Sequence, residues 1–346
     1  MGITIEDVAE RAGVSTATVS RVFNGKGRIA EDTRERVLGV ASEMGYSPRK
    51  YNKKVNMKNI AVINHKWVNS ETPLTAFYSR IVEGMEEVFK KDNFQLMIKT
   101  LNEDKKQNKK IAENIIENNN YRGIVIIGYE IEEYIIKKIK ENKNLPMIFI
   151  DNENFSSDDT LINDNFKGTL QLAEHLIERG HKNIAFIGGP HNHLSLYKRY
   201  MGYKYVLEQA GIYNEKICFR GESCFNLEGG YKTAHKIFEN YDNVTAIMAA
   251  NDYTALGVLK AAQELGIQVP GEIAITGFDD IMMSRHSHPP LTTVRVFKKK
   301  MGKMAANRLL ELIEKKKNVD INVDVEKKVF RVETVIRGST VGNKSE

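Results

Sequence analysis

The sequence is poor in features that mark secreted, membrane-bound or disulfide-linked proteins. It has two cysteines, Cys218 and Cys224, which are too far apart for a CxxC motif and have no second pair. They indicate a reduced, intracellular protein. No apolar run is long enough to span a bilayer, and no signal peptide is recognisable. We therefore expect a cytoplasmic protein without membrane contact.

Motifs for nucleotide binding, metal binding and catalysis are also missing. No GxGxxG follows the first predicted strand and no Walker A lysine motif occurs, so we expect no nucleotide and no cofactor. The pairs His191/His193 and His286/His288 have no identifiable third ligand, which argues against a metal site. Because no nucleophile-elbow motif is visible either, we expect that the protein is not an enzyme.

What the sequence does have is a pair of short helical patterns in residues 4–25, TIEDVAERAGVSTATVSRVFNG. Thr4 is a good N-cap for the first helix, and Asp7 lies in the first turn, where a carboxylate suits the helix dipole. Gly13 ends that helix, and Ser15 caps a second one. Two short helices joined by a tight glycine turn are typical of a helix-turn-helix, whose second helix lies in the major groove of DNA.

The polar face of the second helix favours DNA binding over a helical hairpin in an ordinary core. It carries Thr16, Thr18, Ser20 and Arg21, and no acid. Short side chains let the helix approach base edges, and an arginine can hold guanine at two points, worth about 1–3 kcal/mol of discrimination. Residues 1–60 also hold eleven lysines and arginines against seven acids. This excess predicts salt-sensitive contact with phosphates.

With a third predicted helix at about 31–44 and the following GYSP, the segment resembles the LacI/GalR family of bacterial repressors. The resemblance runs through essentially the whole chain. It implies an all-α helix-turn-helix headpiece over residues 1–47, in which Thr16, Ala17 and Arg21 read bases. The residues that we expect to contact DNA are Thr4, Ser15, Thr16, Ala17, Thr18, Ser20, Arg21, Asn24, Lys53 and Val55.

Residues 48–58 are the expected linker, which contains five basic residues and no acid. In the family this segment becomes a short helix on DNA, and a leucine wedges between base steps in the minor groove and bends the duplex. Here Val55 falls at the wedge position. Valine is shorter than leucine and a weaker helix former, so the depth of the wedge and the degree of bending stay open.

From residue 59 onward, short apolar runs alternate with helical patterns, which indicates parallel sheets covered on both faces. The predicted strands are 59–64, 94–99, 123–128, 146–150, 183–188, 245–250 and 273–278. The alternation occurs twice, which predicts two doubly wound α/β lobes with a cleft between them. The resemblance implies the same periplasmic-binding-protein-like core over 59–340. Its expected parts are lobe 1 at about 59–161 and 294–322, and lobe 2 at about 162–293 and 323–340.

Polar residues close several of these strands, at the edge where such sheets bind ligands. Asp279 and Asn251 follow two strands directly, and Arg199 lies in the helix after another. Carboxylates and amides accept from hydroxyls while arginine donates, a combination that suits a sugar. For Asp164 the alternative of a helix N-cap stays open, and for Phe225 that of a core residue. Position and resemblance together give these expected effector-binding residues: Phe77, Tyr78, Asp164, His193, Ser195, Arg199, Phe225, Asn251 and Asp279.

These expectations combine into one hypothesis, a homodimeric, sequence-specific repressor of carbohydrate-utilisation genes. A sugar or glycoside between the lobes would control its affinity for a palindromic DNA operator, as inducer or as corepressor. The alternative is a regulator of the same fold that responds to a protein partner or to a non-sugar metabolite. Val296 favours this alternative, because the family often has a glutamine at that position. A sugar-modifying enzyme fused to a DNA-binding module is disfavoured, since no catalytic arrangement is visible.

Overall fold

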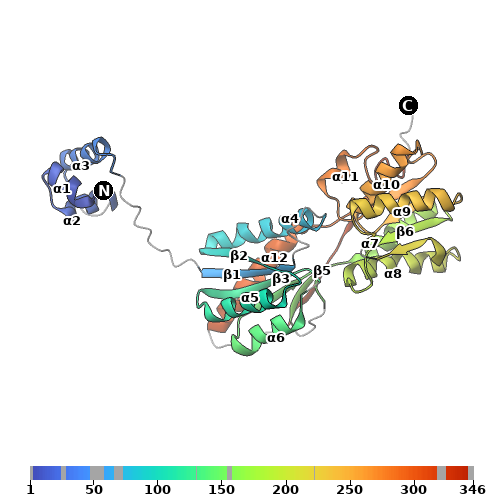
Figure 1. Ribbon diagram of the computed structural model, residues 1–346, viewed down its shortest axis with the longest axis horizontal. Helices are drawn as coiled ribbons and strands as arrows, with labels where there is room; N and C mark the ends of the chain where they lie inside the picture. The colour runs from blue at the N-terminus through green and yellow to red at the C-terminus, as the bar shows by residue number, and fades with distance from the viewer. Residues whose placement is uncertain are drawn as a thin grey trace. The chain divides into compact units, whose positions relative to one another are not determined.

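The computed structural model divides the chain into two compact units, Met1–Met57 and Lys58–Glu346 (Figure 1). It describes residues 3–24, 29–46, 58–65, 73–129, 131–153, 158–221, 223–317 and 325–341. Most of the expected linker, including Lys53 and Val55, therefore lies outside the described residues.

The first unit consists of three helices, α1 (Ile5–Ala12), α2 (Thr16–Asn24) and α3 (Glu31–Glu43). The predicted start of α1 is confirmed, because Thr4 and Asp7 form a reciprocal capping box. Gly13 ends α1 in the left-handed conformation, with a φ of 63°. The small apolar core of the unit is made by Val8, Ala9, Ala12, Val19, Val22, Val37 and Ala41.

The second unit begins with a lobe built on a six-stranded parallel sheet in the order β11-β5-β4-β3-β1-β2. Its strands are β1 (Lys58–His65), β2 (Phe94–Leu101), β3 (Tyr121–Ile127), β4 (Met147–Ile150), β5 (Asp159–Asn163) and β11 (Lys327–Phe330). Its helices are α4 (Pro73–Phe89), the short η2 (Lys90–Asp92), α5 (Lys105–Glu117), α6 (Glu133–Asn142) and α12 (Lys298–Lys317).

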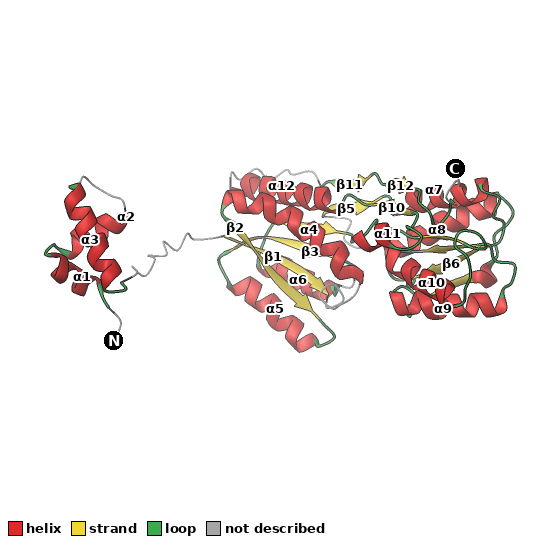
Figure 2. Cartoon of the chain, turned by 90° about the horizontal axis from the view of Figure 1, so that it is seen from above, coloured by secondary structure: helices red, strands yellow, loops and turns green. Residues whose placement is uncertain are grey.

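Alternation along β1 explains why this sheet is covered on both faces. Ile60 and Val62 pack in the cluster that contains α4 and α12, whereas Ala61 and Ile63 pack in the cluster of α5 and α6. Successive strand residues point to opposite faces, so a continuous apolar run supplies both clusters. Figure 2 shows the two helical layers on either side of the strands.

The second lobe has a four-stranded parallel sheet in the order β7-β6-β8-β9. Its strands are β6 (Ile184–Gly188), β7 (Cys218–Arg220), β8 (Ala246–Ala249) and β9 (Ala274–Thr276). Helices α7 (Asn165–Glu178) and α8 (Leu194–Gln209) cover one face, and α9 (Leu227–Asn240) and α10 (Asp252–Glu264) cover the other. The short elements η3 (Glu215–Ile217) and α11 (Met282–His286) complete it.

An antiparallel pair, β10 (Thr293–Arg295) and β12 (Glu333–Val335), joins the lobes. Here the structure differs from the expected boundaries. β11 pairs with β5 in the sheet of lobe 1, so lobe 1 includes residues 327–330 instead of leaving 323–340 to lobe 2, and β5 extends lobe 1 to Asn163. β11 carries exposed lysines, so no apolar pattern in the sequence predicts this strand.

No helix within the described ranges is both long and apolar enough to cross a membrane.

Candidate DNA-binding surface and ligand cleft

Helix α2 presents a polar, DNA-compatible face to solvent. Ser15 caps it as expected, because the Ser15 hydroxyl accepts the Thr18 amide at 3.2 Å. Val19 and Val22 are buried in the headpiece core, and on the other side Thr16, Ala17 and Arg21 are exposed. The helix therefore exposes short side chains and one guanidinium, an arrangement compatible with direct readout of base edges.

The remaining expected DNA contacts have mixed positions. Thr18 and Ser20 are half-buried on the edge of α2, and the Thr18 hydroxyl lies 3.0 Å from that of Ser15. Thr4 is exposed, but its amide and hydroxyl both donate to Asp7, at 2.7 and 2.9 Å. Asn24 ends α2, and its side chain lies outside the described part. Contact between any of these residues and DNA stays a prediction.

In the second unit, Arg199 is the centre of a buried polar cluster in lobe 2. From α8, its Nε donates to Asn165 Oδ1 at 2.8 Å, and its two Nη atoms donate to the Ala250 carbonyl at 2.6 Å and to Asp279 Oδ1 at 3.0 Å. The guanidinium also lies 3.7 Å from the centroid of the Phe278 ring. Arg199 is 5% exposed, and a cation this buried is stable because each side of it has a partner.

Asp151 connects the two lobes at the end of β4. Tyr78 of α4 donates to its Oδ2 at 2.7 Å, and Ser195 of α8 donates to its Oδ1. Burial raises the pKa of Asp151, although both hydrogen bonds oppose that shift. Asp151 is not among the residues expected from the sequence. It nevertheless follows an apolar strand directly, as Asp279 follows β9 and Phe278, so the same signal predicts both.

A stacked pair of rings, Tyr129 and His193, lies near the Asp151 carboxylate. The rings of His193 and Tyr129 stack with centroids 3.8 Å apart. Burial lowers the pKa of His193 to about 3, so this imidazole is neutral near pH 7. Among the described residues, His193 Nδ1 is a buried atom with no hydrogen-bond partner. A buried polar atom of this kind is available to a ligand.

Asn251 and Phe225 lie together in lobe 2. Asn251 Oδ1 accepts the Thr254 amide at 2.8 Å and caps α10, while its Nδ2 donates to the Phe225 carbonyl at 2.9 Å. Phe225 is half-buried against the main core. The amide of Asn251 is therefore engaged in holding the loop that carries Phe225.

Lys298, at the start of α12, lies beside the expected effector-binding residues Asp279 and Phe77, although the sequence did not predict it. Its ammonium donates to the backbone carbonyl of Asp279, lies 5.5 Å from the centroid of the Phe77 ring, and is 9% exposed. Burial lowers the pKa of Lys298, and it raises that of Asp279. Nothing in its sequence context marks Lys298, because it is the first of three consecutive lysines.

Asp164 has the position of a helix cap. Its carboxylate accepts the Lys167 amide at 3.1 Å at the start of α7, and its neighbour Asn165 is the residue that bonds Arg199. The structure thus forms two hydrogen-bonded groups, one that joins Tyr78 and Ser195 through Asp151 and one that joins Arg199 to Asp279, and it places Asp164 beside the second group. Effector binding by each of these residues stays a prediction.

Comparison with known proteins gives the family. The model of the bacterial regulatory proteins, lacI family, matches residues 4–49, and that of the periplasmic binding protein-like domain matches residues 173–340. The chain is 31% identical over 342 residues to the HTH-type transcriptional repressor PurR of Photorhabdus laumondii, with 98% of each chain covered. It is also 31% identical to PurR of Haemophilus influenzae, covering 90% of this chain and 92% of that one.

Two solved structures match nearly the whole length of the chain. The transcriptional regulator CelR in complex with cellobiose superposes with a TM-score of 0.71 at 25% identity, covering 97% of this chain and 99% of that one. The lac repressor dimer bound to operator and the anti-inducer ONPF gives a TM-score of 0.71 at 25% identity, covering 99% and 100%. These relatives are transcriptional regulators and repressors, not enzymes. The chain belongs to the lacI family of bacterial regulatory proteins and is a DNA-binding transcriptional repressor.

Proposed function

We infer that this repressor works as a homodimer whose affinity for a palindromic operator is set by a small polar ligand in the cleft, most simply a sugar or glycoside. It would control carbohydrate-utilisation genes and act in the cytoplasm. The observation that carries the ligand class is a pair of buried polar contacts, Ser195 with Asp151 across the lobes and Arg199 with Asp279 in lobe 2. Such a mixture of donors and acceptors suits a ligand rich in hydroxyls.

The matched regulators support this assignment. CelR, which shares 25% identity with the chain, is seen in complex with cellobiose, a disaccharide, and the lac repressor is seen as a dimer on its operator. A ligand that contacts both lobes changes operator affinity only if it binds the two lobe arrangements unequally. Asp151 and Ser195 lie on opposite lobes, so a ligand that replaces their contact would have this property.

A second candidate effector is a purine base. The relatives with 31% identity over nearly the whole chain are named PurR, and the stacked rings of Tyr129 and His193 form a flat, uncharged wall beside Asp151. A planar heterocycle would stack on such a wall and hydrogen-bond to the orphaned His193 Nδ1.

Calorimetric titration of the full chain separates the two candidates. One panel contains mono- and disaccharides including cellobiose, and the other contains adenine, guanine and hypoxanthine. A sugar that binds and changes operator affinity in a gel-shift assay supports the first proposal, and a purine that does so replaces it. Asp279→Ala should weaken binding of the confirmed effector by at least about tenfold, because it removes a charged hydrogen-bonding group.

Asp242→Ala is the matched control, since it removes an exposed carboxylate of lobe 2 that is not among the expected effector-binding residues. If Asp279→Ala binds the effector as well as the wild type does, the cleft assignment is wrong. Sedimentation velocity of the same samples tests whether the protein is a homodimer. A monomer at the concentrations that bind operator would contradict the proposed homodimer.

A further inference from the structure

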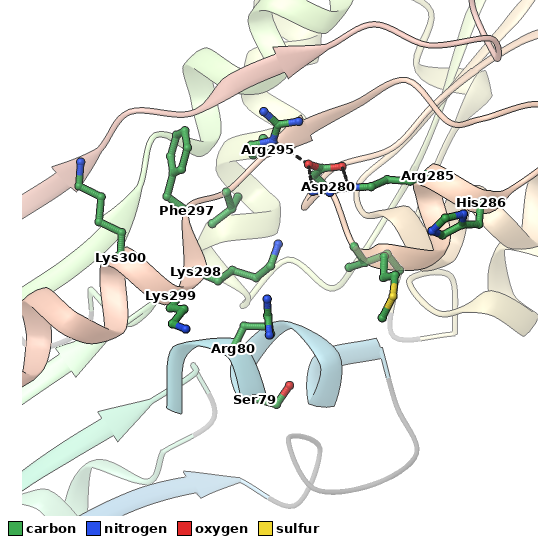
Figure 3. A pocket seen from close by; sticks show the side chains of 13 residues that line it. Ser79, Arg80, Asp280, Arg285, His286, Arg295, Phe297, Lys298, Lys299 and Lys300 are labelled. Atoms are coloured by element: carbon green, nitrogen blue, oxygen red, sulfur yellow. Dashed lines mark hydrogen bonds and ion pairs between the residues drawn. The ribbon is translucent and has the colours of Figure 1, made fainter. Parts of the chain in front are cut away.

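Some charged side chains of the second unit fasten parts of one lobe to each other. Figure 3 shows an example, in which the carboxylate of Asp280 accepts from Arg285 at 2.9 Å and from Arg295 at 2.8 Å. Arg337 donates to the same carboxylate at 2.6 Å, and the Asp280 side chain is 0% exposed. This cluster holds α11, β10 and the segment after β12 together, so its role is to stabilise lobe 2.

A second charged cluster crosses from one lobe to the other. Glu153 follows β4 in lobe 1, and one oxygen of its carboxylate accepts from Lys198 of α8, in lobe 2. The other oxygen accepts from Lys327 of β11, in lobe 1, at 2.5 Å. Each oxygen of one carboxylate therefore binds a different lysine, and the two lysines belong to different lobes.

The carboxylate of this cluster is more buried than its lysines. The Glu153 side chain is 9% exposed, whereas those of Lys198 and Lys327 are 32% and 57% exposed. Burial alone would raise the pKa of Glu153, but hydrogen bonds from both lysines outweigh burial and lower that pKa. Loss of one cation from a carboxylate this buried costs more than loss from an exposed pair, because water replaces the cation only in part.

The contact between Glu153 and Lys198 depends on the arrangement of the lobes. Ser195 and Lys198 are three residues apart on α8, so they lie on the same face of the helix. Ser195 donates to Asp151 and Lys198 donates to Glu153, two positions further along the loop after β4. Separation of the lobes would break both contacts. The bond from Lys327 would persist, since that lysine and Glu153 belong to the same lobe, and it would keep the carboxylate oriented for Lys198.

We propose that Glu153 and Lys198 form an electrostatic latch, which favours the described arrangement of the lobes and weakens as ionic strength rises. The cation of the pair is about a third exposed, and salt screens such charges over a Debye length of about 8 Å at physiological ionic strength. The repressor then responds to ionic strength through its core as well as through its contacts with DNA phosphates. One consequence rests on the proposed function: a ligand that contacts both lobes binds the latched arrangement more tightly.

Zero-length cross-linking of the full chain with a carbodiimide, without DNA or effector, tests the latch directly. The reagent joins a carboxylate to an amine that it contacts, and peptide mapping by mass spectrometry measures the link between Glu153 and Lys198. The internal reference is the link between Glu113 and Lys138, which lie 2.8 Å apart on α5 and α6 of lobe 1. Between about 0.05 M and about 0.5 M salt, we expect the yield of the first link relative to the second to fall at least about twofold.

Variants test the consequence for the repressor. At one fixed salt concentration, Lys198→Gln should lower the affinity for the confirmed effector by about three- to tenfold and shift operator affinity in the direction opposite to the effector. Glu153→Gln, on the other lobe, should reproduce both effects, and the double variant should add little to either change, because all three remove the same contact. Lys204→Gln is the matched control: Lys204 lies on the same helix, is also 32% exposed and pairs with Glu208 within α8.

The proposal is overturned if the link between Glu153 and Lys198 does not form at low salt, or if its yield follows that of the reference pair as salt rises. It is also overturned if Lys198→Gln has the operator affinity of Lys204→Gln. The cross-linking uses the wild type, so it stays valid if a variant unfolds early. Failure of the proposed function gives a different result: no ligand of either panel changes operator affinity, while the cross-link and the operator shift of Lys198→Gln still support the latch.

Discussion

Two adjacent carboxylates, Asp279 and Asp280, have opposite protonation tendencies. Burial raises the pKa of Asp279, and Arg199 and Lys298 compensate for this only in part. Burial would also raise the pKa of Asp280, but hydrogen bonds from three arginines outweigh it and hold that pKa well below its ordinary value of 3.8. Both residues have positive φ values, 109° and 48°, so the loop turns sharply, and the two carboxylates bond different arginines.

Asp280→Asn should lower the free energy of unfolding by about 2–4 kcal/mol at pH 7, because it leaves three arginines around a neutral group. The lowered pKa means that Asp280 stabilises the fold above about pH 4 and loses this contribution as the pH falls further. As the pH is lowered from 7 to below about 4, the free energy of unfolding of Asp280→Asn should therefore decrease less than that of the wild type. Urea unfolding at several pH values measures both effects.

The exposed Asp242→Asn serves as the control for loss of one carboxylate. Equal stability of Asp280→Asn and Asp242→Asn at pH 7 would show that the arginine cluster does not depend on Asp280.

The contribution of Asp252 to stability should depend on pH in the opposite direction. It is 0% exposed, it accepts from Thr293 and from the Ile281 amide, and burial raises its pKa to about 7. A carboxyl whose pKa is higher in the folded state stabilises the fold at low pH and loses that contribution as the pH rises through about 7. Asp252→Asn should reduce the decrease in stability between pH 5 and pH 8 by on the order of 1 kcal/mol. Melting curves at the two pH values check this, and an unchanged difference would exclude Asp252 as the titrating group.

At the scale of elements, the closest packing in lobe 1 joins α4 to α12 through two glycines. A Cβ on Gly302 would lie 1.9 Å from the Ile81 carbonyl oxygen, and one on Gly84 would lie 2.2 Å from that of Lys299. Backbone blocks both positions, so neither can be relieved by a change of rotamer. The two helices lie this close only because both contact points lack side chains.

Gly302→Ala should therefore destabilise the second unit by about 1–3 kcal/mol, as is typical when a packed interface is overfilled. Scanning calorimetry of the full chain measures the shift. Gly39→Ala on α3 is the control, because a Cβ there meets nothing within 4 Å. Gly39→Ala should leave the stability of the first unit as in the wild type, or raise it by up to about 1 kcal/mol because alanine has the higher helix propensity. A Gly302→Ala protein as stable as the wild type would show that the helices can separate without cost.

How much of this could be read from the sequence depends on how local each signal is. The seven apolar strands and the helix-turn-helix are confirmed, because each is encoded by periodicity and caps within a short stretch. β11 was not predicted, since it is held by β5 more than 160 residues earlier. Asp151 and Lys298 were missed for the same reason, because their roles depend on partners in other elements.

At the scale of the second unit, the two lobes are tied by a few specific contacts. Ser195 bonds Asp151, Lys198 pairs with Glu153, and Tyr129 stacks on His193. All three pairs join α8 or the residue before it to loops at the strand ends of lobe 1. Under the proposed function, a ligand bound between the lobes would replace or extend these contacts and so shift the arrangement of the lobes.

For the whole molecule, the decisive property is sequence-dependent binding to duplex DNA. Arg21→Ala should reduce the affinity ratio between operator and unrelated DNA by about 10- to 100-fold, as expected for loss of a two-point contact with guanine. In the wild type, affinity for both DNAs should fall steeply as salt rises, because basic side chains displace counterions from phosphates. Gel-shift titrations at several salt concentrations measure both quantities.

Arg36→Ala, an exposed position on α3, removes the same charge and should leave the affinity ratio unchanged. If both variants keep the ratio and lose only bulk affinity, α2 does not read bases through Arg21. A binding constant that is insensitive to salt would contradict phosphate contact by the basic N-terminal region. The proposed docking, with α2 in the major groove and neighbouring basic residues on the DNA phosphates, requires two results together. The affinity ratio between operator and unrelated DNA must fall in Arg21→Ala but not in Arg36→Ala, and wild-type affinity must fall steeply with salt.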